Sequence, residues 1–354
     1  MRVQTAMQDK TIDILNLNSQ KITYTKYVFA NKGFKELDYK KLNFERISPL
    51  DFLSSDNNFV IKKVVETVTK NTNIDVIGIP LKSCLCKTIS AKIERKNGQK
   101  KVSQKEIEEI TNKLLQKTTN DVNLDNNELF FSDITSVKAD GYKIDFTSEF
   151  KAKNIEIDLL YCYLSKNYLR HLDEFCKKIQ ISPDAILSTT FNLVKNVKTK
   201  KHNYIYFNIS YEDTEVVLVL GDSVVQIKHL SFGKKSIITY VQNNLNLKYT
   251  EAQKLVNSLD VSGDTLAIIN EAYHTFAQAL YTCVKSFSNV EVFPNAFLIN
   301  NNFLTKHKTF NTYLFKELSN LETSDKVVIN NLGEDSYKNV YFSSKDNFFT
   351  AKQF

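Results

Sequence analysis

The sequence FNISYEDT, residues 207–214, gives the clearest indication of the fold. It begins with alternating apolar and polar residues and ends in a polar turn, the pattern of a buried strand that enters a hairpin. A second stretch, LNLN at residues 15–18, repeats its opening. Both read apolar, Asn, apolar, small polar, and both begin a strand–turn–strand unit. Two such units far apart in one chain predict a duplicated α/β fold.

Apolar periodicity outside these two units predicts further helices and strands. Pro80 stops a short strand at 74–79, and Pro183 follows an amphipathic helix near 169–179. No short repeat is present, which argues against solenoids and propellers. The other predicted elements are helices at 56–70, 185–197, 235–245 and 310–318, a long helix after Gly263, a helix opened by a capping box at Thr250, and strands at 216–220, 224–230 and 292–299.

A compact block between residues 84 and 165 lies between the two units. Ser103 and Glu106 form a capping-box sequence that opens an amphipathic helix. An acidic, Asn-rich linker at 120–128 comes after that helix. Strands are predicted at 88–94, near 129–137 and near 155–164. The block therefore has the order strand, helix, strand, strand.

Composition is that of an ordinary soluble protein. The chain has 354 residues, of which 42% are apolar and 25% charged, and its length suggests two or more domains. No run of about 18 apolar residues occurs, so no membrane-spanning helix is expected. The net charge is +7. The basic clusters at 92–105 and 195–202 lack interleaved aromatic residues, which favours solvated faces over a nucleic-acid or acidic-lipid patch.

The cysteines are scattered, and the N-terminal residues lack the apolar core of a secretory signal. A cytoplasmic protein with reduced cysteines is therefore predicted. Cys84 and Cys86 have the wrong spacing for a CxxC pair and no nearby histidine, so burial is expected rather than metal ligation. HExxH, GxSxG and GxxxxGK[ST] sequences are all absent, so no catalytic residue and no metal site is predicted.

The two units and the block between them resemble the bacterial actin-like family, and within it the cell-division protein FtsA and the related type IV pilus protein PilM. Those proteins insert a strand–helix–strand–strand (SHS2) subdomain into their first domain at this place. The segment 179–227 and the sequence LSFG at 230–233 continue in the order found in FtsA. The resemblance covers most of the chain and favours FtsA over PilM. It implies an α/β, actin-like (ribonuclease H-like, duplicated) two-domain fold with an inserted SHS2 subdomain.

The resemblance also implies where the domains lie. The expected parts are a first actin-like domain at 1–83 and 166–202, the inserted subdomain at 84–165, a second actin-like domain at 203–335 and a C-terminal tail at 336–354. FtsA-like proteins often end in a basic amphipathic helix that lies on the membrane. The tail here is aromatic, has few basic residues and has β-prone spacing, so docking onto the protein's own core is the preferred interpretation.

Three loops carry asparagine where an actin-type ATPase needs aspartate and glycine. The family's first loop holds Mg²⁺ through an Asp-x-Gly turn that lets backbone N–H groups approach the phosphates. Asn16 and Asn18 occupy those two positions here, and Ser19 and Lys21 come next. In the adenosine loop a run of three glycines becomes NNN at 300–302, whose side chains would crowd the base and ribose.

In the second loop, the family's Asp-x-Gly-Gly-Gly-Thr-Thr becomes NISYEDT at 208–214. Tyr211 would add bulk. Glu212 and Asp213 would oppose a polyphosphate by on the order of 1–4 kcal/mol for each contact at about 4 Å, unless a metal bridges them. Three losses of roughly one or two kcal/mol each would turn micromolar binding into millimolar binding. Lys21 and Thr214 are the strongest surviving polar candidates.

The implied vestigial nucleotide site consists of Asn16, Asn18, Ser19, Lys21, Asn208, Ser210, Thr214, Gly233, Asn300 and Asn301. For Asn16 and Asn208, turn capping through local side-chain hydrogen bonds is favoured over nucleotide contact. The pair Asp213 and Glu215 is interpreted as a solvated hairpin tip rather than as an acid/base pair. ATP with Mg²⁺ is the one cofactor considered, and it is expected to be optional.

The predicted function is that of a non-catalytic or weakly nucleotide-binding FtsA-like adaptor. It would self-associate or hold partners through the inserted subdomain and the second domain, and the partner that the resemblance implies is the tubulin-like division protein FtsZ. Nucleic acid is not an expected partner, and peripheral contact with the inner face of the membrane stays open. One alternative is a PilM-like pilus scaffold, which binds a short N-terminal peptide of a membrane partner through the inserted subdomain. The other is an active ATPase or sugar-kinase-like enzyme, which needs a catalytic Asp or Glu beside the cleft.

Overall fold

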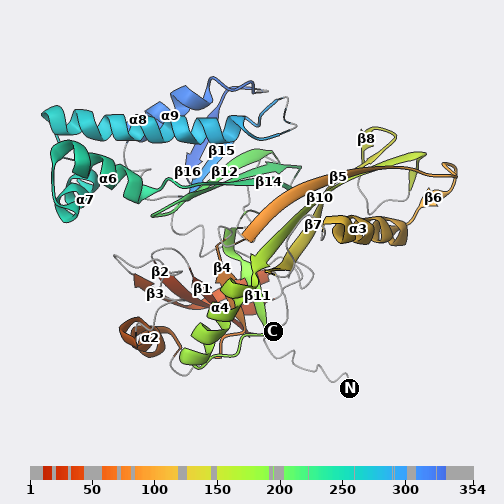
Figure 1. Ribbon diagram of the computed structural model, residues 1–354, viewed down its shortest axis with the longest axis horizontal. Helices are drawn as coiled ribbons and strands as arrows, with labels where there is room; N and C mark the ends of the chain where they lie inside the picture. Colours follow the sequence, from red (N-terminus) through yellow and green to blue (C-terminus); the bar gives the residue numbers. More distant parts are fainter. Residues whose placement is uncertain are drawn as a thin grey trace, which may run out of the picture.

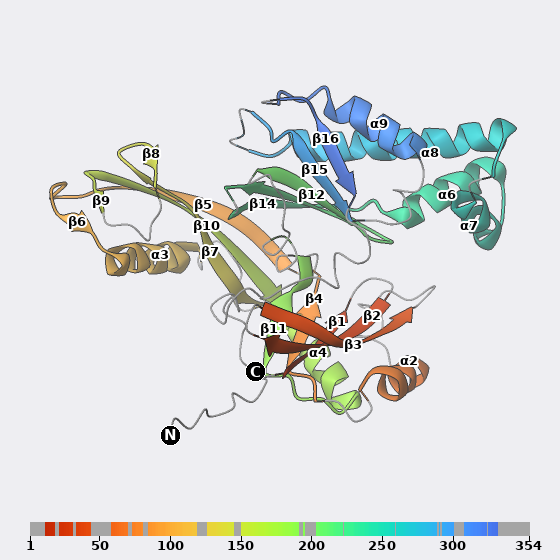
Figure 2. The same cartoon turned by 180° about the vertical axis from the view of Figure 1, so that it is seen from behind.

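Two five-stranded sheets lie one above the other, and a four-stranded sheet extends to one side of both (Figures 1 and 2). The structure is a computed structural model. It describes residues 11–17, 21–30, 33–43, 58–69, 73–80, 84–118, 126–144, 150–190, 194, 203–221, 223–258, 260–288, 290, 292–300, 308–323 and 325–331. The predicted turn at 18–19 and the tail at 336–354 lie outside these residues.

The first sheet has the strand order β3-β2-β1-β4-β11. Strands β1, β2 and β3 form an antiparallel meander, and β4 and β11 run parallel to β1. Helices α2 and α4 lie against one side of this sheet (Figure 1). The bounds are β1 Thr11–Leu17, β2 Lys21–Ala30, β3 Gly33–Asn43, α2 Asn58–Val64, a π-helical turn η1 at Val65–Thr69, β4 Val76–Ile79, α4 Lys166–Lys178 and β11 Ala185–Ser188.

The second sheet repeats this topology with the order β14-β13-β12-β15-β16. Strands β12, β13 and β14 form the meander, and β15 and β16 run parallel to β12. The bounds are β12 Tyr204–Ile209, β13 Thr214–Leu220, β14 Ser223–Leu230, β15 Ala296–Asn300 and β16 Val328–Asn331. The duplication that the two asparagine-bearing stretches predicted is thus present.

Four helices cover one face of the second sheet (Figure 1). Their bounds are α6 Lys234–Leu245, α7 Tyr249–Asn257, α8 Gly263–Lys285 and α9 Lys308–Leu318. Alternation along β12 explains the arrangement. Ile205, Phe207 and Ile209 belong to the core beneath these helices, whereas Tyr204 and Tyr206 belong to a different core on the opposite face.

The four-stranded sheet, order β5-β10-β7-β8, is inserted between β4 and β11 and is called here the inserted sheet. Helix α3 packs on one face of its outer part (Figure 2). The bounds are β5 Cys84–Glu94, α3 Gln104–Thr118, β7 Asn127–Ala139, β8 Tyr142–Lys143 and β10 Asn154–Ser165, with a two-stranded ribbon of β6 Lys101–Val102 and β9 Phe150–Lys151 at the tip. The long elements have the predicted order of strand, helix, strand, strand.

One apolar core runs through all three sheets. It joins Leu15 of the first sheet, Leu160 of the inserted sheet, and Tyr206 and Leu298 of the second sheet in a single contiguous cluster of buried side chains. Each fully buried side chain of this size is worth about 1.5–3 kcal/mol. The contact between the two halves is therefore apolar over much of its extent.

Both predicted capping boxes need correction. At α3, the Ser103 hydroxyl accepts the Glu106 N–H at 3.2 Å, but the Glu106 carboxylate pairs with the buried Arg95 at 2.7 and 3.0 Å instead of reaching back. Helix α7 begins before Thr250, and the Lys248 N–H donates to the Glu251 carboxylate at 3.0 Å. In both helices the glutamate at the third position is used, but only in the second does it cap its own helix.

The helix predicted at 185–197 is wrong in its first part, because residues Ala185–Ser188 form β11. Ala185 and Ile186 pair in register with Val76 and Ile77 of β4, and this parallel pairing outweighs the local helix propensity of the sequence. The remainder is helical only at Thr189 and Thr190 and at residue 194 within the part that the structure describes.

The prediction of reduced cysteines also differs from the structure. Cys86 on β5 and Cys162 on β10 form a disulfide bond, because the antiparallel register sets the two residues directly opposite each other. Cys84, Cys176 and Cys283 are free thiols, and Cys84 is buried as expected. In the described part of the chain, no helix is long and apolar enough to cross a membrane.

Candidate functional site

Asn16 and Asn208 occupy the same place in the two repeated sheets. Asn16 lies near the end of β1 and pairs with Gly78 of β4 on one side and Thr23 of β2 on the other. Asn208 lies near the end of β12 and pairs with Asn300 of β15 and Glu215 of β13. The carboxyl ends of these strands are where the sequence resemblance places the nucleotide of an actin-like fold.

In the first sheet, the Asn16 side chain lies directly over the backbone of Gly78. A Cβ atom added at Gly78 would be 2.1 Å from Asn16 Oδ1 and 2.6 Å from the methyl group of Thr189. The Thr189 hydroxyl donates to the Ile79 carbonyl at 3.1 Å. The glycine is required here because the asparagine amide and the threonine methyl occupy the space that any side chain would take.

In the second sheet, Asn208 belongs to a polar group that we call the Glu215 cluster, formed by Thr190, Asn208 and Glu215. Asn208 Nδ2 donates to Glu215 Oε2 at 2.8 Å and lies 3.0 Å from Thr190 Oγ1. The Thr190 hydroxyl also donates to Glu215 Oε2. Glu215 is 2% exposed and Thr190 is 2% exposed, so the two donors compensate for removing the carboxylate from water.

Thr189 and Thr190 bring the two asparagines into one site. Thr189 lies beside Asn16, and the next residue, Thr190, bonds to the Asn208 side of the molecule. Cys84, at the start of β5, is near the same cluster. Burial raises the pKa of its thiol, and the charge of Glu215 raises it further. The described parts of both sheets and the inserted sheet therefore meet at the Glu215 cluster.

The turn between β12 and β13 is closed by its own hydrogen bonds. The Ser210 N–H donates to the Asp213 carbonyl at 2.9 Å, and the Ser210 hydroxyl bonds to the Asp213 side chain. The Thr214 hydroxyl donates to the Phe232 carbonyl at 2.7 Å, and Thr214 is fully buried. The nucleotide contact considered for Thr214 would therefore require its hydroxyl to leave Phe232.

Helix α6 begins against this turn. A helix N-terminus binds anions through N–H groups that have no partner inside the helix. Here the Lys234 N–H donates to the Ser210 carbonyl at 3.1 Å and the Lys235 N–H donates to the Tyr211 carbonyl at 2.7 Å. A Cβ atom at Gly233 would lie 2.6–2.7 Å from backbone atoms of this turn. The N–H groups that a phosphate would use are thus occupied by the chain itself.

Other side chains of the turn also have partners within the protein. Lys235 pairs with Glu212 at 3.2 Å, and Tyr211 directs its hydroxyl to that of Tyr249 at the start of α7. Burial lowers the pKa of Lys234. The interpretation of Glu215 as part of a solvated hairpin tip is wrong, because this side chain is buried and bonded in the interior.

The remaining predicted site residues are described only in part. Asn18, Ser19 and Asn301 lie outside the described residues. Lys21 and Asn300 are the first residue of β2 and the last of β15, but their side chains are not described. Among the described residues, no group of three His, Cys, Asp or Glu side chains is arranged to hold a metal ion.

Sequence reasoning missed Gly78, Thr189 and Thr190, and it placed Glu215 in solvent rather than at the site. One signal was available for Glu215, because a hairpin that turns at 210–213 sets residue 215 opposite Asn208. No comparable signal was available for the threonines, which reach the site from the end of β11.

Comparison with known proteins gives a likeness in fold but not in sequence. No known protein family matches the chain, and no curated protein sequence matches it. A chain of the PilM-PilN type IV pilus biogenesis complex superposes with a TM-score of 0.64 at 10% identity, over 94% of this chain and 90% of that chain. The ethanolamine utilization protein EutJ from Carboxydothermus hydrogenoformans superposes with a TM-score of 0.51 at 8% identity, over 94% and 89%.

A third structure is described as a protein with actin-like ATPase fold and unknown function, from Bacteroides thetaiotaomicron. It has a TM-score of 0.38 at 10% identity, over 93% of this chain and 94% of that chain. At such identities, likeness concerns the fold alone. The duplicated sheets and the first two likenesses show that the chain has the actin-like ATPase fold that was expected. Descent from FtsA, the SHS2 assignment and the domain boundaries stay predictions.

Proposed function

We propose that this chain is a non-catalytic actin-fold scaffold that binds a protein partner and does not turn over ATP. The observation that carries the proposal is the Glu215 cluster, in which the chain's own carboxylate takes the donors at the centre of the site. An ATPase of this fold would leave such donors, and the N–H groups of the adjoining helix, for phosphate.

A triphosphate entering this site would have to displace several internal hydrogen bonds. Separating Glu215 from Asn208 and Thr190 would leave a buried carboxylate and the buried Thr190 hydroxyl without their partner, at a cost of about 1–3 kcal/mol for each unsatisfied group. Opening the turn would also free the Lys234 and Lys235 N–H groups from Ser210 and Tyr211. A negatively charged ligand would meet Glu215 and Glu212 there.

Isothermal titration of the purified chain with Mg-ATP tests this part of the proposal. We expect no binding at micromolar concentrations and no release of phosphate over hours. Micromolar affinity, or ATP turnover that Asn208→Ala abolishes, would overturn the proposal and favour the active ATPase or sugar-kinase-like alternative. An enzyme of that kind would need a carboxylate free to act, which the bonded Glu215 is not.

A partner surface is supported by an exposed apolar pair on the inserted sheet. Tyr163 of β10 pairs in register with Leu85 of β5 on one side and Leu129 of β7 on the other, so the three side chains share one face. Tyr163 is buried, whereas Leu85 is 45% exposed and Leu129 is 38% exposed. Helix α3 covers the outer part of this face and contacts Ile89.

The apolar pair fits an apolar segment of a protein partner. Apolar side chains that are exposed together on one face can mark a site of protein–protein interaction. The superposed PilM chain belongs to a PilM-PilN complex, and this supports a protein partner for the present fold. An FtsZ-like partner and self-association have no support from these observations and stay predictions.

Photo-crosslinking in the native host tests the partner surface. A photo-reactive amino acid placed at position 85 or 129 is expected to give one discrete protein adduct, and the same amino acid at position 37 serves as the control because Leu37 is 54% exposed on the distant strand β3. Mass spectrometry of the adduct distinguishes a pilus-type membrane protein from a tubulin-like division protein. Adducts that are equal at all three positions, or absent at 85 and 129, would contradict the proposed surface.

A further inference from the structure

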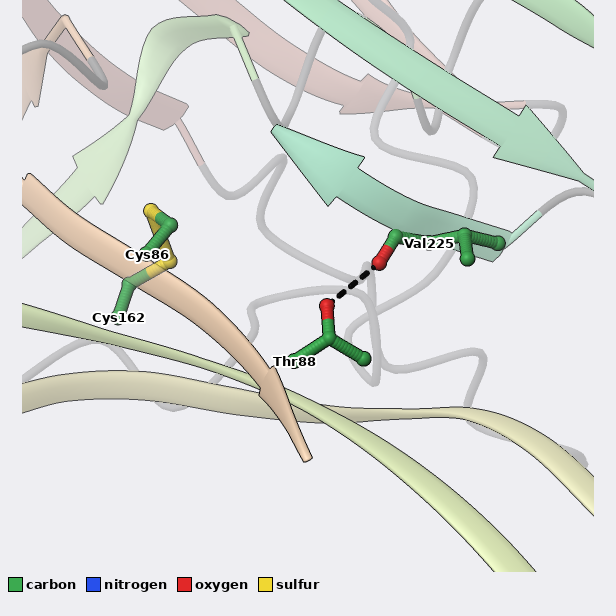
Figure 3. The surroundings of a disulfide bond; sticks show 4 residues. All are labelled: Cys86, Thr88, Cys162 and Val225. Atoms are coloured by element: carbon green, nitrogen blue, oxygen red, sulfur yellow. Dashed lines mark hydrogen bonds between the residues drawn. A yellow bond between two sulfur atoms is a disulfide. The ribbon is translucent and has the colours of Figure 1, made fainter. Parts of the chain in front are cut away.

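The disulfide bond lies beside the contact between the inserted sheet and the second sheet. Cys86 and Cys162 are directly opposed residues of β5 and β10, with their Cα atoms 4.1 Å apart. Two residues along β5, on the same face, the Thr88 hydroxyl donates to the Val225 carbonyl of β14 at 2.7 Å. Figure 3 shows the disulfide and this hydrogen bond together.

We propose that the Cys86–Cys162 disulfide is a reversible thiol–disulfide switch that controls how firmly the inserted sheet is held against the second sheet. Among the described strands, β5 is at the edge of its sheet and pairs there with β10. An edge strand with one neighbour opens more easily than a central strand. The disulfide fixes β5 to β10 close to the position from which Thr88 reaches β14.

The two cysteines of the bond differ in burial, and this difference directs an incoming thiol to Cys86. Cys86 is partly exposed, whereas Cys162 is fully buried. A small thiol of the glutathione class would attack Cys86 Sγ as the thiolate. The Cys86–Cys162 bond breaks, Cys162 leaves with the electron pair and takes a proton from water, and Cys86 is left in a mixed disulfide. A second thiolate attacks the sulfur of the small thiol in that mixed disulfide, and Cys86 leaves and takes a proton.

The net change reduces one protein disulfide to two thiols and oxidises two small thiols to one small disulfide. The reverse reaction uses the oxidised small disulfide as the oxidant. Exchange requires an accessible disulfide sulfur and a thiolate, and Cys86 supplies the first while the small thiol supplies the second. A glutathione-class thiol and its disulfide therefore serve as the reductant and the oxidant of the switch.

Cys84 does not compete in this exchange, although it lies two residues from Cys86 on the same strand. It is buried, and burial together with the charge of Glu215 raises the pKa of its thiol. In the antiparallel pairing Cys84 lies opposite Leu164, whereas Cys86 lies opposite Cys162. The switch therefore opens and closes between Cys86 and Cys162 without transferring the bond to Cys84.

The test uses the full-length protein in glutathione buffers of graded ratio. Thiols are trapped with N-ethylmaleimide and counted by mass spectrometry, and the folded state is checked by circular dichroism. We expect Cys86 and Cys162 to gain or lose their labels together as the ratio changes. Hydrogen exchange of the reduced protein is expected to be about tenfold faster in peptides covering 84–94 and 223–230, and unchanged in α8.

Two variants show whether the effect passes through the named contact. Cys283→Ser removes a free thiol on helix α8, which packs in the core on the opposite face of the second sheet, and is expected to keep the whole response. Thr88→Val keeps the disulfide and removes the hydrogen bond to Val225, so the response of 84–94 is expected to remain and that of 223–230 to be lost.

Three results would overturn the proposal. The first is a folded protein in which Cys86 and Cys162 stay reduced at every glutathione ratio. The second is equal exchange rates in the oxidised and reduced wild-type protein, a comparison that needs no variant to fold. The third is a response at 223–230 that survives Thr88→Val at full size.

Discussion

The first and second sheets have the same strand order but fill matched positions differently. Beside Asn16 the first sheet has Gly78 and Thr23, and beside Asn208 the second sheet has Asn300 and Glu215. In the first sheet the asparagine lies over bare backbone, and in the second it is bonded to a buried carboxylate. In the second sheet, therefore, the carboxylate of Glu215 occupies the centre of the candidate site.

Under the proposed function, the difference describes how a binding site can be lost without loss of the fold. Both asparagines keep the strand ends in place, because each sits in a position that its sheet neighbours define. The second sheet adds Glu215 and the closed turn. Nucleotide binding is therefore opposed there by groups that fill the site, and not only by the loss of the aspartates that would bind Mg²⁺. The largest effects of substitution are therefore expected in the second half.

Glu215→Ala is expected to have the largest effect on stability. It removes the acceptor for Asn208 and Thr190 and leaves a cavity, which costs about 2–5 kcal/mol. The matched substitution in the first sheet, Thr23→Ala, is expected to cost only ~1 kcal/mol, for a lost methyl group and hydroxyl. Urea unfolding followed by circular dichroism measures both free energies, and equal costs would contradict the comparison.

Gly233→Ala is expected to have the next largest effect. The new Cβ would meet backbone atoms of residues 210, 211 and 213 at 2.6–2.7 Å, and backbone cannot move aside as a side chain can. The expected loss of stability is about 1–3 kcal/mol. Gly98→Ala, whose nearest contacts would be 3.1 Å away, is the control in thermal unfolding. A smaller loss at 233 than at 98 would show that the turn is not tightly packed against α6.

Gly78→Ala tests the first sheet. Its new Cβ would collide with the side chains of Asn16 and Thr189 rather than with backbone, so a loss of ~1–2 kcal/mol is expected. Adding Asn16→Ala should recover part of that loss, by about 0.5–1 kcal/mol of coupling in a double-mutant cycle. A cycle with no coupling, measured by urea unfolding, would mean that the asparagine is not what requires the glycine.

The smallest effect concerns Asp75, which lies just before β4 of the first sheet. Burial, more than any other cause, raises the pKa of the Asp75 carboxyl, and the charge of Asp13 adds to this, although a hydrogen bond from the Asp13 N–H opposes it. Because the pKa is higher in the folded state, that state holds more protons, and stability falls as the pH rises from the ordinary value of 3.8 through the raised value.

Asp75→Asn is therefore expected to stabilise the protein at pH 7 more than at pH 3. Urea midpoints at the two pH values measure the difference, with the exposed Asp325→Asn as the control. A benefit of equal size at both pH values would contradict the raised pKa, since a group protonated in both states at low pH brings no penalty there.

Much of the fold could be predicted from the sequence because the repeated units have strong local patterns. Strands β12 and β13 are short apolar runs on either side of a polar turn, and helix α3 of the inserted block has an N-terminal cap and an apolar stripe. Strand β3, Gly33–Asn43, was missed because its exposed side carries mainly charged residues and Leu37 is exposed. Strand β11 was mistaken for a helix because only its parallel pairing with β4 decides its conformation.

The candidate site could be predicted only at its two asparagines. Thr190 and Glu215 lie 25 residues apart in sequence, and the link between them depends on how β11 ends beside the second sheet. The disulfide partners are 76 residues apart, and five cysteines allow many pairings until the strand register is known. In both cases the contact joins two elements that are far apart in sequence, and local sequence patterns do not predict how such elements are placed relative to each other.

The apolar core that joins Leu15, Leu160, Tyr206 and Leu298 has a consequence for any attempt to divide the molecule. A recombinant fragment with only the second half would present one whole side of its sheet to solvent, including Tyr206, Val217 and Leu298, which are at most 2% exposed in the intact chain. Such a fragment would aggregate through this exposed apolar face instead of refolding. Calorimetry of the whole protein should accordingly record one heat-absorption peak, because the halves melt as a unit.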